Sequence, residues 1–125
     1  MKKYQQMDIV FNTINEGIII TDKNGNIIYI NKVAVKILKN SPIDDILGQN
    51  ISKALPFCKL LLKTLQTGKK YLHHEVYAEE YDNHYMVSSQ PLLDENNNLS
   101  GGVAVIRDME TVRQIYQKNY RTAFY

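Results

Sequence analysis

Apolar residues recur along this chain at two different spacings, which separate helical from extended segments. Residues 3–15 carry them at intervals of three, four and three, as one face of an amphipathic helix requires. The four positions are Tyr4, Met7, Phe11 and Ile14. After Asp108 the helical spacing returns, at Met109, Val112 and Tyr116. The pattern therefore predicts a helix at each end of the chain.

Two short β-branched runs follow the first helix. They are Gly17–Thr21 and Ile27–Ile30, and the polar turn Asp22–Asn26 separates them. Asn31 comes next, ahead of apolar residues at helical spacing, where its side-chain oxygen can accept a hydrogen bond from a free N–H group of the first turn. This segment predicts a strand, a turn, a strand and a capped helix. Such an order is typical of a structural scaffold, and it contains no catalytic motif.

The middle of the chain is predicted to be helical. Ser41–Gly48 fits one helical turn that ends at its glycine. Ile51–Gln66 fits a longer helix that Pro56 divides and Gly68 ends. Three further strands are predicted beyond it, with turns at Glu79–Asn83 and Asp94–Asn98. These strands are Tyr71–Ala78, His84–Leu92 and Leu99–Arg107.

This order of elements predicts an α+β fold. Consecutive strands joined by short turns form an antiparallel sheet, and helices clustered mid-chain pack together on one of its faces. Alternation along the second of the three late strands places one set of side chains on a common face, namely Tyr85, Val87, Ser89 and Pro91. The last strand is apolar on both faces, because Val103 and Val105 alternate with Ala104 and Ile106. Its outward face needs a cover, from the N-terminal helix or from a second copy of the chain.

Composition and charge narrow the class of protein. With 125 residues, 44% of them hydrophobic, the chain is long enough for one domain with its own core. The net charge of +2 comes from scattered residues, which argues against a nucleic-acid-binding face. A single cysteine, Cys58, excludes an internal disulfide, and the chain shows neither a secretory signal nor an apolar run long enough to span a bilayer. We expect a cytoplasmic protein without direct contact with nucleic acid or membrane.

Several segments match part of a metal-binding or phosphate-binding motif but lack other residues that the motif requires. Asp22–Asn26 starts like a calcium loop, but Ile27 occupies its glycine position and Val33 its final glutamate position. Gly68 and Lys69 lack the earlier glycine and the following hydroxyl of a phosphate loop. The sequence therefore predicts strand-connecting turns in these places.

Candidate catalytic residues fail for reasons of geometry. His73 and His74 are adjacent in a predicted strand, so their side chains point to opposite faces and cannot share a metal ion. Ser88 and Ser89 lack the sharp turn that exposes a nucleophile. Apolar neighbours favour a buried thiol over a reactive one at Cys58. No metal site and no enzyme activity are predicted.

Three segments in the right order resemble the PAS family of sensor domains. The first carries the family positions Gly17, Asp22, Gly25 and Asn31. The second is Leu47–Ile51, and the third joins Gln90–Asp94 to Gly102–Asp108. The resemblance implies a five-stranded antiparallel sheet with helices over one face in residues 16–108. It also implies a flanking helix at 1–15, a linker helix at 109–125 and a non-catalytic sensory role.

PAS domains bind ligands between the helices and the inner face of the sheet, where the resemblance places Tyr85 and Ser89. Either these side chains contact a small metabolite, or Tyr85 packs in a filled core with its hydroxyl satisfied, which we favour. Pro56–Leu60 lacks the Asn-Cys-Arg-Phe run of the flavin branch, and residues 51–66 lack the histidine of the haem branch. Flavin and haem are therefore disfavoured and no cofactor is predicted, which leaves an unidentified metabolite. The competing class is an enzyme or small-molecule carrier that uses this cavity.

The family passes its signal through Asp, a small apolar residue and then Thr or Ser at the end of the last strand. Asp108 and Met109 match the first two positions. Glu110 stands where the hydroxyl is expected, and Thr111 follows one residue late. We expect Asp108 both to relay the signal and to N-cap the C-terminal helix, with Thr111 as the candidate for the second contact.

The helical spacing at both termini also predicts a homodimer. Its interface would comprise Tyr4, Met7, Phe11 and Ile14 together with Met109, Val112 and Tyr116. The tail Asn119–Tyr125 resembles the lead-in to the ATPase domain of sigma-54-dependent transcription activators, which implies an effector domain beyond Tyr125. A sensor histidine kinase of a two-component system is the alternative parent protein.

Overall fold

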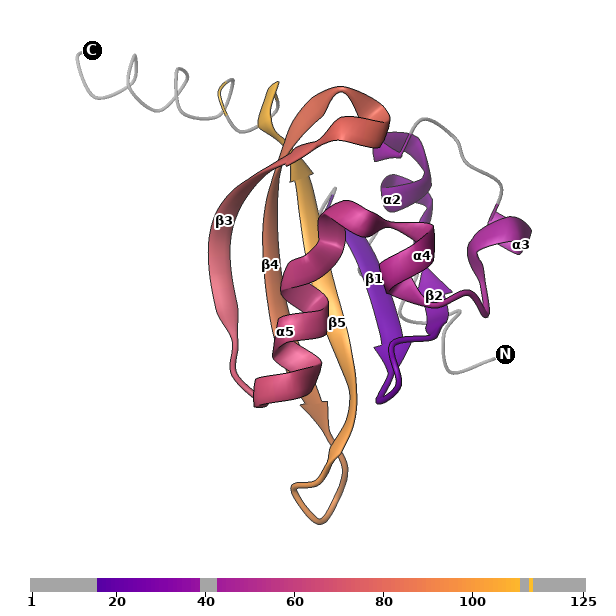
Figure 1. Ribbon diagram of the computed structural model, residues 1–125, viewed down its shortest axis with the longest axis vertical. Coiled ribbons are helices and arrows are strands. Elements are labelled where there is room, and N and C mark those ends of the chain that lie inside the picture. Colours follow the sequence, from indigo (N-terminus) through magenta and orange to yellow (C-terminus); the bar gives the residue numbers. More distant parts are fainter. Residues whose placement is uncertain (1–15, 39–42, 111–112, 114–125) are drawn as a thin grey trace, which may run out of the picture.

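The computed structural model of the chain describes residues 16–38, 43–110 and 113 (Figure 1). Five strands form one sheet in the spatial order β2-β1-β5-β4-β3, and every neighbouring pair is antiparallel. The strands are β1 (Gly17–Asp22), β2 (Ile27–Ile30), β3 (Tyr71–Ala78), β4 (Asn83–Leu93) and β5 (Leu99–Asp108). The predicted α+β class and its five-stranded sheet are confirmed, with β1, β4 and β5 one residue longer at one or both ends than the sequence indicated.

Short helices cover one face of this sheet. They are α2 (Lys32–Ile37), α3 (Ile43–Ile46), α4 (Ile51–Ala54), the 3-10 helix η1 (Pro56–Cys58), α5 (Lys59–Thr67) and the 3-10 helix η2 (Glu79–Tyr81). In Figure 1, α5 crosses in front of β4 and β5. The predicted helix over Ile51–Gln66 is divided at Pro56, as expected of a residue that lacks an N–H group. Gly68 ends α5 in the left-handed conformation, with φ of 71°.

The predicted N-terminal helix at residues 3–15 lies outside the described residues, as do Thr111, Val112 and Tyr116. None of the helices in the described part of the chain is long and apolar enough to cross a bilayer.

Asn31 connects the start of β1 to the start of α2. Its side-chain oxygen accepts hydrogen bonds from the N–H groups of Ala34 (2.9 Å) and Ile18 (3.0 Å), and its amide donates to the carbonyl of Glu16 (2.8 Å). The residue is fully buried. The predicted N-cap is therefore confirmed, and the same side chain also fixes the first strand.

Two aspartates close two of the strand-connecting turns in the same way. Asp22 accepts hydrogen bonds from the N–H groups of Asn24 and Asn26, both at 2.9 Å. Asp94 accepts from those of Asn96 (2.8 Å) and Asn98 (3.0 Å). Partial burial acts to raise the pKa of Asp22, but the hydrogen bonds from Asn26, Asn24 and Gly25 outweigh it and lower that pKa. Both predicted turns are confirmed.

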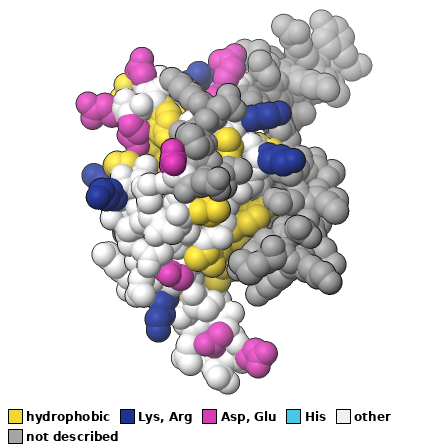
Figure 2. All heavy atoms as spheres, turned by 90° about the vertical axis from the view of Figure 1, so that its right-hand side faces the viewer, with side chains coloured by type: hydrophobic (Ala, Val, Ile, Leu, Met, Phe, Trp, Pro, Cys, Tyr) yellow, Lys and Arg dark blue, Asp and Glu magenta, His cyan; other side chains and the backbone are white. Residues whose placement is uncertain are grey.

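The sheet is apolar on both faces, as the alternation in the last strand indicated. Ala104 and Ile106 belong to the large core between the sheet and the helices. Val103 and Val105 pack on the opposite face against a smaller cluster made of Ile18, Ile20 and Tyr29. Figure 2 shows the side of the molecule that lies on the right in Figure 1, where hydrophobic side chains form a band and charged ones of both signs are scattered around it.

Candidate functional site

Tyr85 lies on β4 and points into the core between the sheet and the helices, on the face predicted for it. Its side chain is fully buried, and its ring stacks on Phe57 with a centroid distance of 5.3 Å. Its hydroxyl donates a hydrogen bond of 3.1 Å to the carbonyl of Ile37. Burial is the main cause that raises the pKa of Tyr85, so the phenol remains a proton donor at neutral pH.

Ser89 lies two residues further along β4 on the same face and is also fully buried. Its hydroxyl donates to the carbonyl of Leu60 at 3.2 Å and forms a second, short hydrogen bond with the hydroxyl of Thr64. Because the single proton of Ser89 is already used, Thr64 donates in that bond. Tyr85 and Ser89 therefore face inward as expected, but the polar group of each has a partner within the protein. Their role as ligand contacts stays a prediction.

Helix α5 approaches β5 closely at Gly102. A Cβ atom built there would lie 2.7 Å from Cδ1 of Leu61 and 3.2 Å from Cδ2 of Leu65. The space beside this glycine is thus filled by leucine side chains. Thr21, which pairs with Gly102 across β1 and β5, is buried and its hydroxyl has no hydrogen-bond partner among the described residues. The sequence did not single out Thr21, although its place in the alternation of β1 marks it as inward-facing.

Asp108 joins the end of the sheet to the residues that follow it. One carboxylate oxygen accepts a hydrogen bond of 2.8 Å from the N–H group of Glu110, as an N-cap does. The other accepts a hydrogen bond of 3.1 Å from the side-chain amide of Asn83, at the start of β4. The hydrogen bond to Glu110 confirms the predicted capping role of Asp108. Met109 is partly buried beside it.

Glu16 and Arg107 form an ion pair that the sequence analysis missed. Glu16 immediately precedes β1, and Arg107 immediately precedes Asp108. The pair therefore connects the points where the chain enters and leaves the sheet. Ninety-one positions separate the two residues, so no local pattern could reveal the contact.

The remaining candidate side chains stand apart from one another. Cys58 is buried, and burial, reinforced by the charge of Glu80, raises the pKa of its thiol, which keeps it protonated and unreactive. His73 and His74 line opposite faces of β3, and His84 lies 3.6 Å from the carboxylate of Glu75. Within the described residues no three metal-ligating side chains come together.

Solved structures that share this fold define its class. The PAS domain of a protein from Colwellia psychrerythraea aligns with a TM-score of 0.63 at 18% identity, over 84% of this chain and 95% of that one. The PAS domain of BvgS from Bordetella pertussis aligns with a TM-score of 0.62 at 15% identity, over 97% and 99% of the two chains. At such identities the likeness shows the fold, which is the PAS fold.

The sequence itself assigns the family. The family model described as "PAS domain" matches residues 15–111, and the chain therefore belongs to the PAS domain family. A "Signal-transduction and transcriptional-control protein" of Clostridium beijerinckii is 29% identical over 126 residues, which are all of this chain and 20% of that protein. Sensor protein CitS of Halalkalibacterium halodurans is 25% identical over 128 residues, which are 98% of this chain and 23% of that protein. The chain thus spans about a fifth of the length of these curated relatives, and it is a PAS sensory domain of the kind found in signal-transduction proteins.

Proposed function

We propose that the chain is a non-catalytic sensory and dimerisation module of a larger signalling or transcription-regulatory protein. It works without flavin or haem and relays the state of a ligand or partner through the helix after Asp108. The observation that carries the proposal is the position of Asp108. Its carboxylate accepts one hydrogen bond from Asn83 in the sheet and another from Glu110 in the helical residues that follow. A shift of β4 against β5 would therefore reach the start of that helix directly.

The parent protein is proposed to be a transcription activator of the sigma-54-dependent class or a sensor histidine kinase. The transcriptional-control protein of Clostridium beijerinckii supports the first, and the sensor protein CitS supports the second. Both arrangements place the effector domain after Tyr125, so that the helix following Asp108 would be its connection.

Asp108→Ala is expected to loosen the residues directly after β5. The substitution removes the cap on the Glu110 N–H group and the bond to Asn83, while it leaves the core untouched. Hydrogen–deuterium exchange should therefore become at least about threefold faster for amides 109–113, since a lost cap weakens the first turn by about 1 kcal/mol. Exchange in β1 and β2 should stay unchanged.

Asp94→Ala provides the matched control for this experiment. It removes two hydrogen bonds of similar length at the opposite end of the β4–β5 hairpin. Faster exchange of amides 109–113 in Asp94→Ala as well, or unchanged exchange in Asp108→Ala, would contradict the proposed relay.

The purified chain is expected to be a dimer in sedimentation velocity at about 50 μM, the range in which modest interfaces associate. Phe11→Asp should shift it toward monomer, because Phe11 lies in the predicted apolar stripe with Tyr4, Met7 and Ile14. Glu95→Gln, in an exposed turn, should leave the distribution unchanged. A monomer at every concentration up to that limit would refute dimerisation of this chain.

A further inference from the structure

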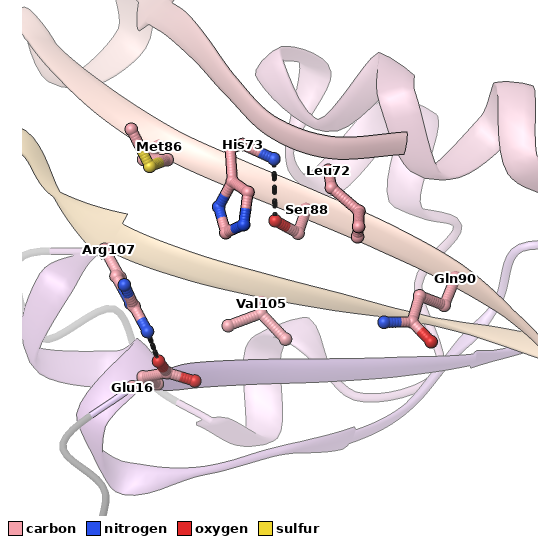
Figure 3. A pocket seen from close by; sticks show the side chains of 8 residues that line it. All are labelled: Glu16, Leu72, His73, Met86, Ser88, Gln90, Val105 and Arg107. Carbon is pink, nitrogen blue, oxygen red and sulfur yellow. Dashed lines mark hydrogen bonds and ion pairs between the residues drawn. The ribbon is translucent and has the colours of Figure 1, made fainter. Parts of the chain in front are cut away.

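A groove crosses the outer face of the sheet, on the side opposite the helices. It has a volume of about 280 Å³, and all the residues that line it belong to the described part of the chain. Its apolar lining comes from Leu72 on β3, Met86 on β4 and Val105 on β5 (Figure 3). The volume lies just below the range of about 300–1,000 Å³ that is usual for small-molecule sites, so a short ligand would fit.

One end of this outer groove carries the charged groups. Figure 3 shows the guanidinium of Arg107 pointing toward the carboxylate of Glu16 at this end. The side chain of Arg107 is 41% exposed and that of Glu16 17% exposed, so a ligand can reach the arginine from solvent. Arginine presents a planar set of donors that matches a carboxylate, and here the protein fills it with a carboxylate of its own.

Uncharged polar groups line the rest of the groove. The hydroxyl of Ser88 accepts a hydrogen bond of 2.9 Å from the N–H group of His73, whose φ of 58° lies in the left-handed region at a shift in strand register. The imidazole of His73 and the amide of Gln90 have no hydrogen-bond partner among the described residues. Both side chains line the groove and are exposed. They are free to bond a polar group on a bound molecule.

The inner face of the sheet offers less to a ligand. The hydroxyls of Tyr85 and Ser89 already bond to main-chain carbonyls, and leucine side chains fill the space beside Gly102. The outer groove instead combines an exposed cation, an apolar floor and unpaired polar groups in one place.

We propose that this outer groove is a binding site for a small molecule with a carboxylate on an apolar body. The carboxylate would bond Arg107 in place of Glu16, and the apolar part would lie on Met86 and Val105. Because Arg107 is the neighbour of Asp108 and Glu16 precedes β1, binding would separate the two ends of the domain. This inference rests on the proposed sensory function and names the site and the class of ligand that would drive it.

The site is tested by titrating the ¹⁵N-labelled chain with sodium hexanoate, with hexanamide as the uncharged control. Hexanoate should shift the amide signals of Met86, Val105 and Arg107 in a saturable manner, and hexanamide should shift them far less. Two substitutions should change the affinity in opposite directions. Glu16→Gln removes the competing carboxylate and should tighten hexanoate binding by about fivefold, while Arg107→Gln should abolish it.

Glu95→Gln is the matched control, because it makes the same chemical change in the exposed turn between β4 and β5, and it should leave the affinity unchanged. Circular dichroism confirms that each variant is folded. Weaker binding in Glu16→Gln, unchanged binding in Arg107→Gln, or no saturable shift in any of the proteins would overturn the proposal. None of these results would affect the relay through Asp108, which is measured separately by hydrogen exchange.

Discussion

Gly101→Ala is expected to lower the free energy of unfolding by about 3 kcal/mol, because it forces a new atom into a filled contact between strands. Gly101 pairs with Asp22 across β1 and β5, and a Cβ atom built on it collides with the backbone oxygen of Thr21. A backbone atom cannot rotate out of the way as a side chain can. The two strands would have to separate locally, with loss of their hydrogen bonds. Urea denaturation followed by circular dichroism measures the change.

Two other glycines serve as controls for Gly101→Ala. At Gly102 the added Cβ atom would meet the end of the Leu61 side chain, which can change its rotamer, so we expect a loss of about 1–2 kcal/mol. At Gly48 nothing lies within 4 Å, and only the positive φ of 86° opposes alanine, which costs about 1 kcal/mol. A loss at Gly101 no larger than that at Gly48 would show that β1 and β5 do not pack as closely as described.

The elements that the sequence predicted best are those whose cause is local. The turn at Asp22 and the cap at Asn31 each depend on residues within four positions, and both are present as expected. The inward face of β4 followed from alternation alone, since one residue in two must point the same way in a strand. The division of the long helix followed from Pro56, which removes a donor wherever it stands.

The features that sequence reasoning missed depend on contacts between distant segments. The hydrogen bond from Ser89 to Leu60 joins β4 to α5 across 29 positions, and the ion pair of Glu16 with Arg107 spans 91. The spacing of apolar residues does not indicate which polar groups form hydrogen bonds or ion pairs once the strands and helices have packed together. For the same reason the sequence could place Tyr85 on the inner face but could not identify the carbonyl of Ile37 as the acceptor of its hydrogen bond.

The two faces of the sheet therefore suggest different roles. On the inner face, the hydroxyls of Tyr85 and Ser89 are paired with carbonyls of the helices, which favours a fixed packing of helices on sheet. On the outer face, a partly buried ion pair joins the two ends of the domain beside the outer groove. The arginine of this pair is accessible from solvent, so a competing carboxylate can replace Glu16 without opening the core. A signal that enters at the outer face would therefore need less energy than one that repacks the core.

Asn31→Ala is expected to lower the free energy of unfolding by about 3 kcal/mol and to loosen the start of β1. The substitution leaves two buried N–H groups and one partly buried carbonyl without this partner, and a buried group left unpaired costs about 1–3 kcal/mol. These groups are the N–H of Ala34, the N–H of Ile18 and the carbonyl of Glu16. Because Glu16 also holds Arg107, the ion pair should weaken as well, and the amide signal of Arg107 should shift.

Asn50→Ala separates the capping contribution of Asn31 from its effect on the strand. Asn50 caps α4 by accepting from the N–H group of Ser52 at 3.1 Å, but this hydrogen bond lies at the surface, where water can replace it. We therefore expect Asn50→Ala to cost about 1 kcal/mol, as an ordinary N-cap does. Equal losses for the two substitutions, or an Arg107 signal that stays in place in Asn31→Ala, would mean that Asn31 acts only as a helix cap. A larger loss for Asn31, accompanied by that shift, would place it in the connection between the first strand and the end of the last.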